Sequence, residues 1–511
     1  MSTQTSDNNK RIAKNTALLY FRMLFLMFIG LFTSRINLQA LGIDNFGIYN
    51  VVGGVVAMFS ILTGSLGVAI SRDITFELGK GNTEKLNKVF SSAVTIQILM
   101  SVVIVVLAEI VGVWFLNNKM VIPEERLYAA NWVLQFSIIS FVLSLVSVPY
   151  NACIIAHEKM SAFAYITIYE AIMKLVVAYT VFITPFDKLI TYSALLLFIS
   201  LTMRLIYGIY CAKHFEECHY QFAFDKKMLK HMGGFAGWTM IGNLAWVGYS
   251  QGINILLNLF FGPSVNAARG VAMQVNEKVS SFCTNFQMAL NPQITKSYAS
   301  NDLDRMHTLI YASSKYSFFM LLLLSLPIMI EAPSILHYWL GEYPDHSVWF
   351  VRLIFMILMV DATANPLTVG AQANGKIKKY QIIVGSIQLL IVPISYIVLK
   401  LGYQPEAVFV VHFIIIIIAQ YIRVMMLRDM INLPFGEYVK KVVFRIVAVV
   451  CASIIIPIVL HIYLPANFGS MLLTCLASCL SVLIGVYALG LTPEEKDKIN
   501  IKLVKFINRN K

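Results

Sequence analysis

Apolar runs of about twenty residues recur along the whole chain, and each is long enough to cross a membrane. A helix rises 1.5 Å per residue, so such a run covers a hydrocarbon core of roughly 30 Å. The runs give the 511-residue chain a composition that is 58% hydrophobic and 13% charged. That is too little charge for the surface of a soluble protein of this length. The sequence therefore predicts an all-α, polytopic membrane protein.

Hydropathy predicts about fourteen membrane-spanning helices, six in each half of the chain and two more after residue 430. The opening segment 1–15 lacks the apolar core and the small-residue cleavage site of a signal peptide, so we expect no cleavage there. The spans are expected to begin near Ala17, Phe46, Val89, Leu127, Ser161, Leu189, Gly233, Val265, Leu309, Ser347, Lys378, Pro405, Lys440 and Gly469.

The stretch from Gly42 to Ala93 recurs at an offset of 220, which places Gly42 on Gly262. Identity between the copies is low, but a tight hairpin, an apolar helix, a charged loop and the next helix keep one register. A second pair of segments aligns at an offset of 217, which places Pro149 on Pro366. Internal repeats of this kind are common in transporters. The repeat predicts two pseudo-symmetric six-helix bundles followed by two C-terminal helices.

The repeat and the loop composition divide the chain into five parts. The tail opens with Thr492 as the predicted N-cap of a helix, Pro493 at the first helical position and Glu495 at the third. Its lysines lie beside an apolar stripe, which is typical of a helix on a membrane surface. The parts are an N-terminal six-helix bundle (10–215), a cytoplasmic linker (216–232), a C-terminal six-helix bundle (233–430), two extra transmembrane helices (431–490) and a basic amphipathic cytoplasmic tail (491–511).

Lysine and arginine gather at one set of loop ends. By this topology 26 of them lie on one side, and only Lys119, Arg126, Lys188 and Lys400 lie on the other. The positive-inside rule then places both termini in the cytoplasm. The net charge of +13 belongs to the cytoplasmic face, where we expect contact with anionic membrane lipids. Because the basic residues are dispersed between spans, no nucleic-acid partner is expected.

The seven cysteines form no recognisable framework in the sequence. Five lie in apolar spans, while Cys211 and Cys218 lie near the inner face. There is no CxxC motif and no Cys/His metal spacing, so neither a disulfide framework nor a metal site is predicted. Small buried hydrophobic residues are the better interpretation of these cysteines.

Two motifs carry a resemblance to a known family: LGIDNFGIYNVVGG at 41–54 and SRDITFELGKGN at 71–82. Together they resemble the opening of bacterial polysaccharide biosynthesis proteins of the oligosaccharide-unit (O-antigen type) flippase class. That class belongs to the multidrug/oligosaccharidyl-lipid/polysaccharide exporter superfamily. The resemblance covers essentially the whole chain, including the half-repeat and the two extra helices.

The resemblance implies a cation-lined cavity between two six-helix bundles that opens alternately to the two sides of the bacterial cytoplasmic (inner) membrane. The implied cargo is an undecaprenyl-pyrophosphate-linked oligosaccharide used for capsule, lipopolysaccharide or other surface polysaccharide. We expect a monomer that needs no cofactor.

Charges inside the membrane that break the repeat are the best candidates for function, because repetition preserves what the scaffold needs. Each costs at least about 2.5–3.5 kcal/mol to insert, so it normally faces a partner or a wet cavity. Arg35 falls on Ile255 and Arg269 on Tyr49, each about 9 Å below the outer end of its span. Their guanidinium groups offer the planar fork of donors that suits a diphosphate.

Other intramembrane charges extend this hypothesis. Lys278 and Lys174 would continue a basic path inward, and Arg22 and Arg204 are further candidate ligands of the substrate. A coupling proton or sodium ion would need a carboxylate, and the candidates are Glu277, Asp361 and Glu170.

Structural roles compete with these functional ones. Glu170 and Lys174 are four residues apart on one helical face and would neutralise each other. Five cations near helix ends are expected to reach the lipid headgroups instead. These are Arg22, Lys315, Arg352, Arg423 and Arg445.

Two other functions remain open. A cation-coupled drug or small-molecule antiporter of the same superfamily would favour acids in its cavity, whereas this chain offers arginines. A membrane-embedded glycan polymerase or ligase would ordinarily carry a sizeable external loop, and the external loops here are short. The sequence contains no P-loop, HExxH or DxD-type soluble domain, so no catalytic residues and no enzymatic activity are predicted.

Overall fold

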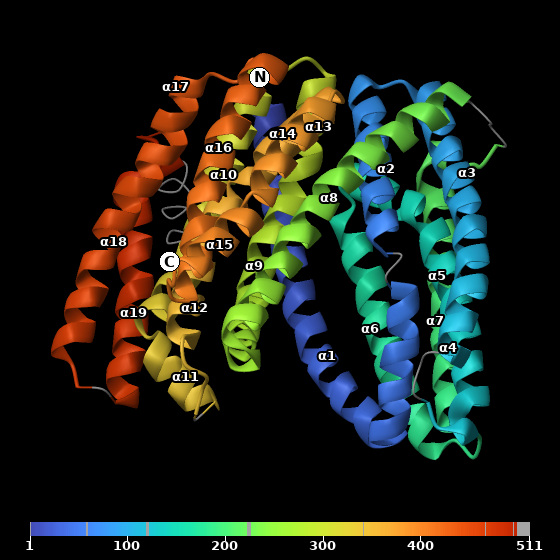
Figure 1. The fold of residues 1–511 in the computed structure, drawn as a ribbon. Helices are drawn as coiled ribbons and strands as arrows, with labels where there is room; N and C mark the ends of the chain where they lie inside the picture. The colour runs from blue at the N-terminus through green and yellow to red at the C-terminus, as the bar shows by residue number, and fades with distance from the viewer. Residues whose placement is uncertain are drawn as a thin grey trace, which may run out of the picture. The chain divides into compact units, whose positions relative to one another are not determined.

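The computed structural model describes residues 2–57, 60–118, 122–221, 226–340, 342–465, 467–493 and 495–497. Within these ranges the regular structure is helical throughout, with no strand (Figure 1). Ten of the described helices are long and apolar enough to cross a membrane, which makes this a multi-pass membrane protein. Four of the fourteen expected spans are not among the ten. Two of them were expected to begin near Ala17 and Phe46, where the described residues contain only the shorter apolar stretch Asn15–Gly30. The other two are the long helices over 226–261 and 263–299. Their polar and glycine residues lower their hydropathy.

The chain divides into two compact units. The first contains residues 1–243 together with 295–301, and the second contains 244–294 and 302–511. The helices up to the middle of α8 belong to the first unit: α1 (Ser2–Ala57), α2 (Ser60–Lys80), α3 (Thr83–Leu107), α4 (Val113–Asn118), α5 (Glu124–Ala156), α6 (Met160–Ile183), α7 (Lys188–His214) and α8 (Lys226–Phe261), with a π-helical turn η1 (Ala108–Gly112) and a 3-10 turn η2 (Glu216–Cys218).

The remaining helices build the second unit, except for the last residues of α9. They are α9 (Pro263–Ala299), α10 (Leu303–Ile330), α11 (Ala332–Leu340), α12 (Ser347–Ala362), α13 (Ala364–Asn374), α14 (Lys378–Leu389), α15 (Ile391–Lys400), α16 (Glu406–Ile431), α17 (Phe435–Tyr438), α18 (Phe444–Tyr463) and α19 (Phe468–Gly485), with π-helical turns η3 (Val439–Val443) and η4 (Val486–Gly490).

The backbone confirms the internal repeat at the positions where the chain must turn. Gly42 and Gly262 both take a left-handed conformation, with φ angles of 76° and 80°. Gly81 and Asn301, which the same alignment pairs, have φ angles of 71° and 60°. Residues other than glycine or asparagine rarely adopt this conformation. Its recurrence at matched positions shows that both halves use the same two turns.

The helix that follows the second of these turns begins in the same way in both halves. The side chain of Asn82 caps α3 by accepting a hydrogen bond from the backbone N–H of Lys85. Asp302, the counterpart of Asn82 in the repeat, caps α10 by accepting one from Arg305. A side-chain oxygen at this position satisfies a backbone donor that the helix leaves free.

The second pair of repeated segments also matches in conformation. Pro149 lies inside α5 and Pro366 inside α13, so each half carries a proline within a helix. The turn that follows contains Glu158 with a φ angle of 58°, and its counterpart Gly375 has a φ angle of 82°. Glu158 thus holds a conformation for which the second half uses glycine.

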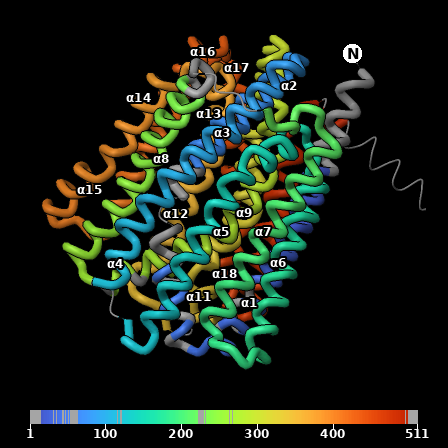
Figure 2. The backbone as a smooth tube through the Cα atoms, turned by 90° about the vertical axis from the view of Figure 1, so that its right-hand side faces the viewer, coloured from blue at the N-terminus to red at the C-terminus, as the bar shows by residue number. Residues whose placement is uncertain are grey.

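Packing in the first unit centres on two helix pairs, in which α5 lies along α7 and α1 along α6 (Figure 2). In the second unit the two C-terminal helices α18 and α19 pack against each other and against α10. A buried apolar cluster in that unit includes Leu257, Phe350 and Phe355.

The predicted start of the tail is confirmed as far as it is described. Thr492 Oγ1 accepts a hydrogen bond from the backbone N–H of Glu495 at 3.2 Å, and Glu495 Oε2 accepts one from the N–H of Thr492 at 2.7 Å. This reciprocal pair is a capping box. The rest of the tail, 498–511, lies outside the described residues.

The expectation that Lys315 and Arg423 extend to the headgroups is wrong. Lys315 is only 3% exposed and forms an ion pair with Glu495 at 2.8 Å. Arg423 is buried and donates to Gln420 Oε1 at 3.4 Å. Both cations find polar partners inside the unit, so they need not reach the membrane surface.

Candidate functional site

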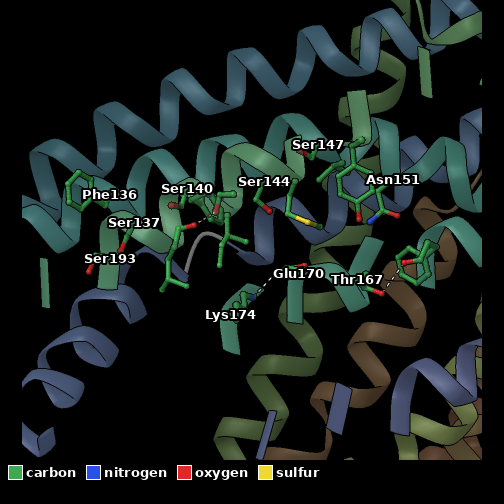
Figure 3. A pocket seen from close by; sticks show the side chains of 18 of the residues that line it. Phe136, Ser137, Ser140, Ser144, Ser147, Asn151, Thr167, Glu170, Lys174 and Ser193 are labelled. Carbon is green, nitrogen blue, oxygen red and sulfur yellow. Dashed lines mark hydrogen bonds and ion pairs between the residues drawn. The ribbon is translucent and has the colours of Figure 1, made fainter. Parts of the chain in front are cut away.

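The first unit contains a cavity of about 590 Å³ bounded by α1, α5, α6 and α7 (Figure 3). Its volume falls in the range of roughly 300–1,000 Å³ typical of ligand sites. The residues that line it are Arg22, Tyr49, Phe136, Ser137, Ser140, Phe141, Ser144, Ser147, Val148, Asn151, Phe163, Thr167, Glu170, Lys174, Ser193, Leu196, Ile199, Ser200, Met203 and Tyr207.

One wall of the cavity is a row of hydroxyl groups on α5. Ser137, Ser140, Ser144 and Ser147 are spaced three and four residues apart, which places them on one face of the helix. Asn151 continues the row, as Figure 3 shows. Hydroxyls and amides both donate and accept hydrogen bonds, so this wall suits a neutral, polyhydroxylated ligand.

Sequence reasoning missed this wall because it considered only ionisable residues. The signal that could have revealed it is a serine periodicity of three and four within an apolar helix.

Arg22 supplies the positive charge at the cavity. Its Nε donates to Thr167 Oγ1 at 2.7 Å, and its guanidinium lies 4.4 Å from the centroid of the Phe163 ring. These two contacts use one N–H edge and one face of the group. Within the described part of the chain Nη1 and Nη2 donate no hydrogen bond, so the fork remains available. Because Arg22 lines the cavity and bonds Thr167, the expectation that it reaches the headgroups is wrong, and its role as a ligand stays a prediction.

Glu170 and Lys174 also line the cavity, and they form the ion pair that their spacing predicted. The distance from Lys174 Nζ to Glu170 Oε1 is 2.6 Å (Figure 3). Lys174 is exposed and Glu170 is partly exposed, so the pair contributes at most about 1 kcal/mol to stability. The pair largely cancels its own charge, which leaves Arg22 as the dominant charge in the cavity.

Two other predicted arginines of the first unit contribute less to the site. Arg204 does not line the cavity; it donates to the hydroxyl of Tyr150 at 3.0 Å and stacks 4.2 Å from the centroid of the same ring. Arg35 lies on α1, but its side chain is outside the described part of the structure.

Arg269 is held by polar groups of α8 in the second unit. Its Nη2 donates to the carbonyl oxygen of Ser250 at 3.1 Å, and its Nη1 donates to Asn254 Oδ1 at 3.3 Å. Its Nε is buried without a hydrogen-bond partner among the described residues. The guanidinium is thus fixed in place with one donor unused.

Glu277, Lys278 and Asp361 also belong to the second unit. Glu277 and Lys278 are exposed side chains of α9, and no described residue forms a salt bridge with either. The side chain of Asp361, near the end of α12, is accessible to solvent even though residues of the unit enclose it. It lies within electrostatic range of Arg423 and Tyr249.

A polar network adjoins Asp361. Gln420 Nε2 donates to Thr363 Oγ1 at 2.8 Å and to the hydroxyl of Tyr438 at 3.3 Å. Gln420 in turn accepts from Arg423. An exposed carboxylate beside such a network is suited to exchange a small cation with water.

The structure thus brings Arg22, Glu170 and Lys174 together in one cavity of the first unit. It places Arg269, Glu277, Lys278 and Asp361 in the second unit. Sequence reasoning gave no reason to separate these two groups.

A family model described as "Polysaccharide biosynthesis protein" matches residues 12–298. Among solved structures, a MATE in complex with MaD3S has a TM-score of 0.72 at 14% identity, covering 83% of this chain and 96% of that one. An outward-facing multidrug resistance MATE family transporter of the MOP superfamily has a TM-score of 0.68 at 15% identity, covering 82% and 96%.

A MOP superfamily transporter from Pyrococcus furiosus Vc1 (DSM3638) has a TM-score of 0.67 at 14% identity, again covering 82% and 96%; the reverse polarity of its binding pocket is described as suggesting a different function. These likenesses show a shared fold and confirm the predicted fold class. No protein with a curated description matches the sequence at a significant level.

Proposed function

This chain belongs to the polysaccharide biosynthesis protein family and is a multi-pass membrane transporter, and we propose that it flips an undecaprenyl-pyrophosphate-linked oligosaccharide across the bacterial cytoplasmic membrane. The observation that carries the proposal is the cavity of the first unit, where a wall of hydroxyls meets a guanidinium whose Nη1 and Nη2 donate to no described residue. The oligosaccharide would be the building unit of capsule, lipopolysaccharide or another surface polysaccharide.

The two polar features of the cavity correspond to the two polar parts of this cargo. Sugar hydroxyls exchange donors and acceptors with the serine row, and Phe136 and Phe141 offer apolar surface to sugar rings. The diphosphate accepts hydrogen bonds from Nη1 and Nη2 of Arg22, which Thr167 and Phe163 hold in position. The lipid tail stays in the membrane.

The repeat reveals an asymmetry between the halves that supports this assignment. At an offset of 217, Ser137, Ser140 and Ser147 fall on Ile354, Ile357 and Ala364, so three of the four serines have apolar counterparts in the second half. Serines that the scaffold needs would be expected at the matching positions of both halves. The serine row is therefore better explained by recognition of a polar ligand.

The same alignment places Ser144 on Asp361. Where the first half carries a hydroxyl, the second carries a carboxylate beside Arg423 and Gln420. We assign substrate recognition to the first unit and coupling of a proton or sodium ion to Asp361, with Glu277 as a second candidate; Glu170 is less suited because it is paired with Lys174. Cargo movement then follows from alternating access between bundles over 10–215 and 233–430, with both termini cytoplasmic.

A drug or small-molecule antiporter of the same superfamily is the alternative. A cationic cargo needs an unpaired acid, and the carboxylate that lines the cavity, Glu170, is paired with Lys174. Arg22 would repel such a cargo. The polarity of the cavity therefore favours an anionic ligand.

Deletion of the gene tests the proposal in cells. We expect loss of the surface polysaccharide and accumulation of its lipid-linked units on the cytoplasmic side. Complementation with Arg22→Ala should fail, whereas Arg445→Ala, the same substitution in α18 where Arg445 bonds the carbonyl of Gly490, should restore export. Lipid-linked units that still reach the outer face of deleted cells would contradict the proposal.

A further inference from the structure

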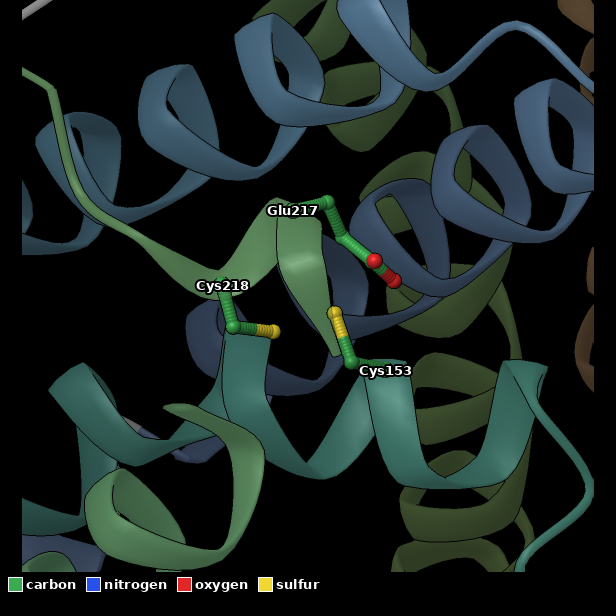
Figure 4. A group of neighbouring side chains, drawn as sticks. All are labelled: Cys153, Glu217 and Cys218. Carbon is green, nitrogen blue, oxygen red and sulfur yellow. The ribbon is translucent and has the colours of Figure 1, made fainter. Parts of the chain in front are cut away.

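Three potential metal ligands converge where the end of α5 meets η2 (Figure 4). Cys153 lies in the last turn of α5, and Glu217 and Cys218 follow α7 in η2. Their two sulfurs and a carboxylate oxygen all lie within 4.8 Å of one another. All three residues are buried, with exposed fractions of 0%, 7% and 4%.

A third thiol adjoins this cluster. Cys211, in the last turn of α7, is buried, and its thiol contacts that of Cys218. Its Sγ donates to the carbonyl oxygen of Tyr150 at 3.5 Å, so it faces α5. None of these cysteines forms a disulfide.

The carboxylate of Glu217 is held from its other side. His157 Nε2 and Glu217 Oε1 are 2.5 Å apart, and the His157 ring stacks on Phe215 with centroids 4.2 Å apart. In metal sites a second layer of this kind orients a ligating carboxylate and leaves its other oxygen for the metal.

The geometry fits zinc. A tetrahedral zinc ion binds thiolate sulfur at about 2.3 Å and carboxylate oxygen at about 2.0–2.2 Å, so its ligand atoms lie roughly 3.5–4 Å apart. Atoms already within 4.8 Å reach that spacing through small side-chain rotations. Cys211 lies outside this group of three, so its thiol must turn from the Tyr150 carbonyl to supply the third sulfur and complete four coordination. Thiolates select zinc over magnesium or calcium.

We propose that Cys153, Cys211, Glu217 and Cys218 bind one structural zinc ion. The metal takes the place of the three thiol protons, which leave to solvent, and no group is oxidised or reduced. The site carries a net negative charge, which Arg204, within electrostatic range of Cys211, partly offsets. The sequence concealed this site because its ligands come from separate helices and form no motif.

The proposed zinc ion would connect the segment that follows the first six-helix bundle to that bundle. Hydrogen bonds from Asn87 Nδ2 to the carbonyls of Glu217 (2.9 Å) and His219 (3.0 Å) already connect this segment to α3. Zinc would add bonds from η2 to α5 and α7. Because a thiol must lose its proton to bind zinc, zinc affinity should increase with pH.

The test uses the full-length protein in detergent, purified under reducing conditions, stripped with a chelator and dialysed against micromolar zinc. We expect one zinc per chain, and with cobalt(II) in place of zinc we expect thiolate charge-transfer absorption and the visible bands of a tetrahedral site. Zinc should also protect three of the seven cysteines from a thiol-alkylating reagent.

Variants connect the metal to these residues. Cys153→Ser and Cys218→Ser should each weaken zinc binding at least tenfold, whereas Cys283→Ser, at a buried cysteine of α9, should leave it unchanged. Size-exclusion chromatography and circular dichroism check that each variant is folded. Wild-type protein that retains less than a tenth of a zinc ion per chain would overturn the proposal, whatever the variants do. Undiminished zinc in a folded Cys153→Ser, Cys218→Ser double variant would overturn it as well.

Discussion

Glu158 should be one of the most sensitive positions for stability in the first unit, because it combines a buried ion pair with a left-handed backbone. Its Oε1 lies 2.8 Å from Nζ of Lys296, and the exposed fractions of the two side chains are 0% and 21%. Its carbonyl oxygen accepts a hydrogen bond from Asn15 at 3.2 Å. The pair holds the end of α9 to the turn between α5 and α6.

The structure sets the size of the effect. Removing one partner of a buried ion pair costs about 3–5 kcal/mol, and because Lys296 can turn partly to water we expect the lower end, about 3 kcal/mol, for Glu158→Ala. Glycine adopts the φ of 58° without the penalty of about 1–2 kcal/mol that a side chain brings. Glu158→Gly should therefore lose only about 1–2 kcal/mol.

The assay is unfolding in mixed micelles, with the protein in dodecylmaltoside titrated with sodium dodecyl sulfate and followed by circular dichroism. A double-mutant cycle of Glu158→Ala with Lys296→Met should give a coupling free energy of about 2 kcal/mol or more. Equal stabilities of the alanine and glycine variants would refute the backbone reasoning. A coupling below about 0.5 kcal/mol would refute the importance of the pair.

Further predictions concern the candidate site and one titrating group. Arg22→Lys keeps the charge but loses the fork, so we expect export to fall partially, and Arg22→Ala should lower it by about tenfold or more, measured as surface polysaccharide at equal protein levels. Lys174→Gln should change export less than threefold, since its charge is already paired. Arg269→Ala tests whether the second unit also contributes a ligand. Its guanidinium keeps one donor, Nε, unused among the described residues, so we expect reduced export without loss of folded protein. Wild-type export by an Arg35→Ala, Arg269→Ala double variant would show that both residues are structural. Burial of Glu495 opposes ionisation, but hydrogen bonds from Lys315 and from Thr492 lower the pKa of its carboxyl below the ordinary value of about 4.3. Wild-type protein should therefore be about 2 kcal/mol more stable than the Glu495→Gln variant above a pH of about 4.3, and this difference should disappear as the pH falls through the lower pKa of Glu495 in the folded protein. A stability difference that persists below both the folded-state and the unfolded-state pKa would contradict this.

The sequence was sufficient to predict the repeat because its turns constrain the backbone. Gly42 and Gly262 align despite low identity, and both adopt left-handed φ angles. A capping pattern is equally local, so the hydrogen bonds between Thr492 and Glu495 were predictable from four consecutive residues.

Features that depend on tertiary packing were not predictable in this way. Lys315 pairs with Glu495, which lies 180 residues away in the sequence. The position of Lys315 near a helix end therefore did not predict its partner. Arg22 likewise lies 145 residues from Thr167, and its role in the cavity becomes visible only once α1 packs on α6. A pattern of intramembrane charges identifies candidates, but it cannot tell which of them share a cavity.

Movement of the lipid-linked cargo itself tests the central claim most directly. The purified chain is reconstituted into liposomes that hold an undecaprenyl-pyrophosphate-linked oligosaccharide in both leaflets, and a membrane-impermeant glycosidase is added outside. Protein-free liposomes should keep the inner-leaflet half protected. The proposed function predicts that wild-type protein exposes nearly all of the cargo to the enzyme, while Arg22→Ala leaves the inner half protected. Wild-type liposomes that protect the inner half as well as protein-free ones would contradict it.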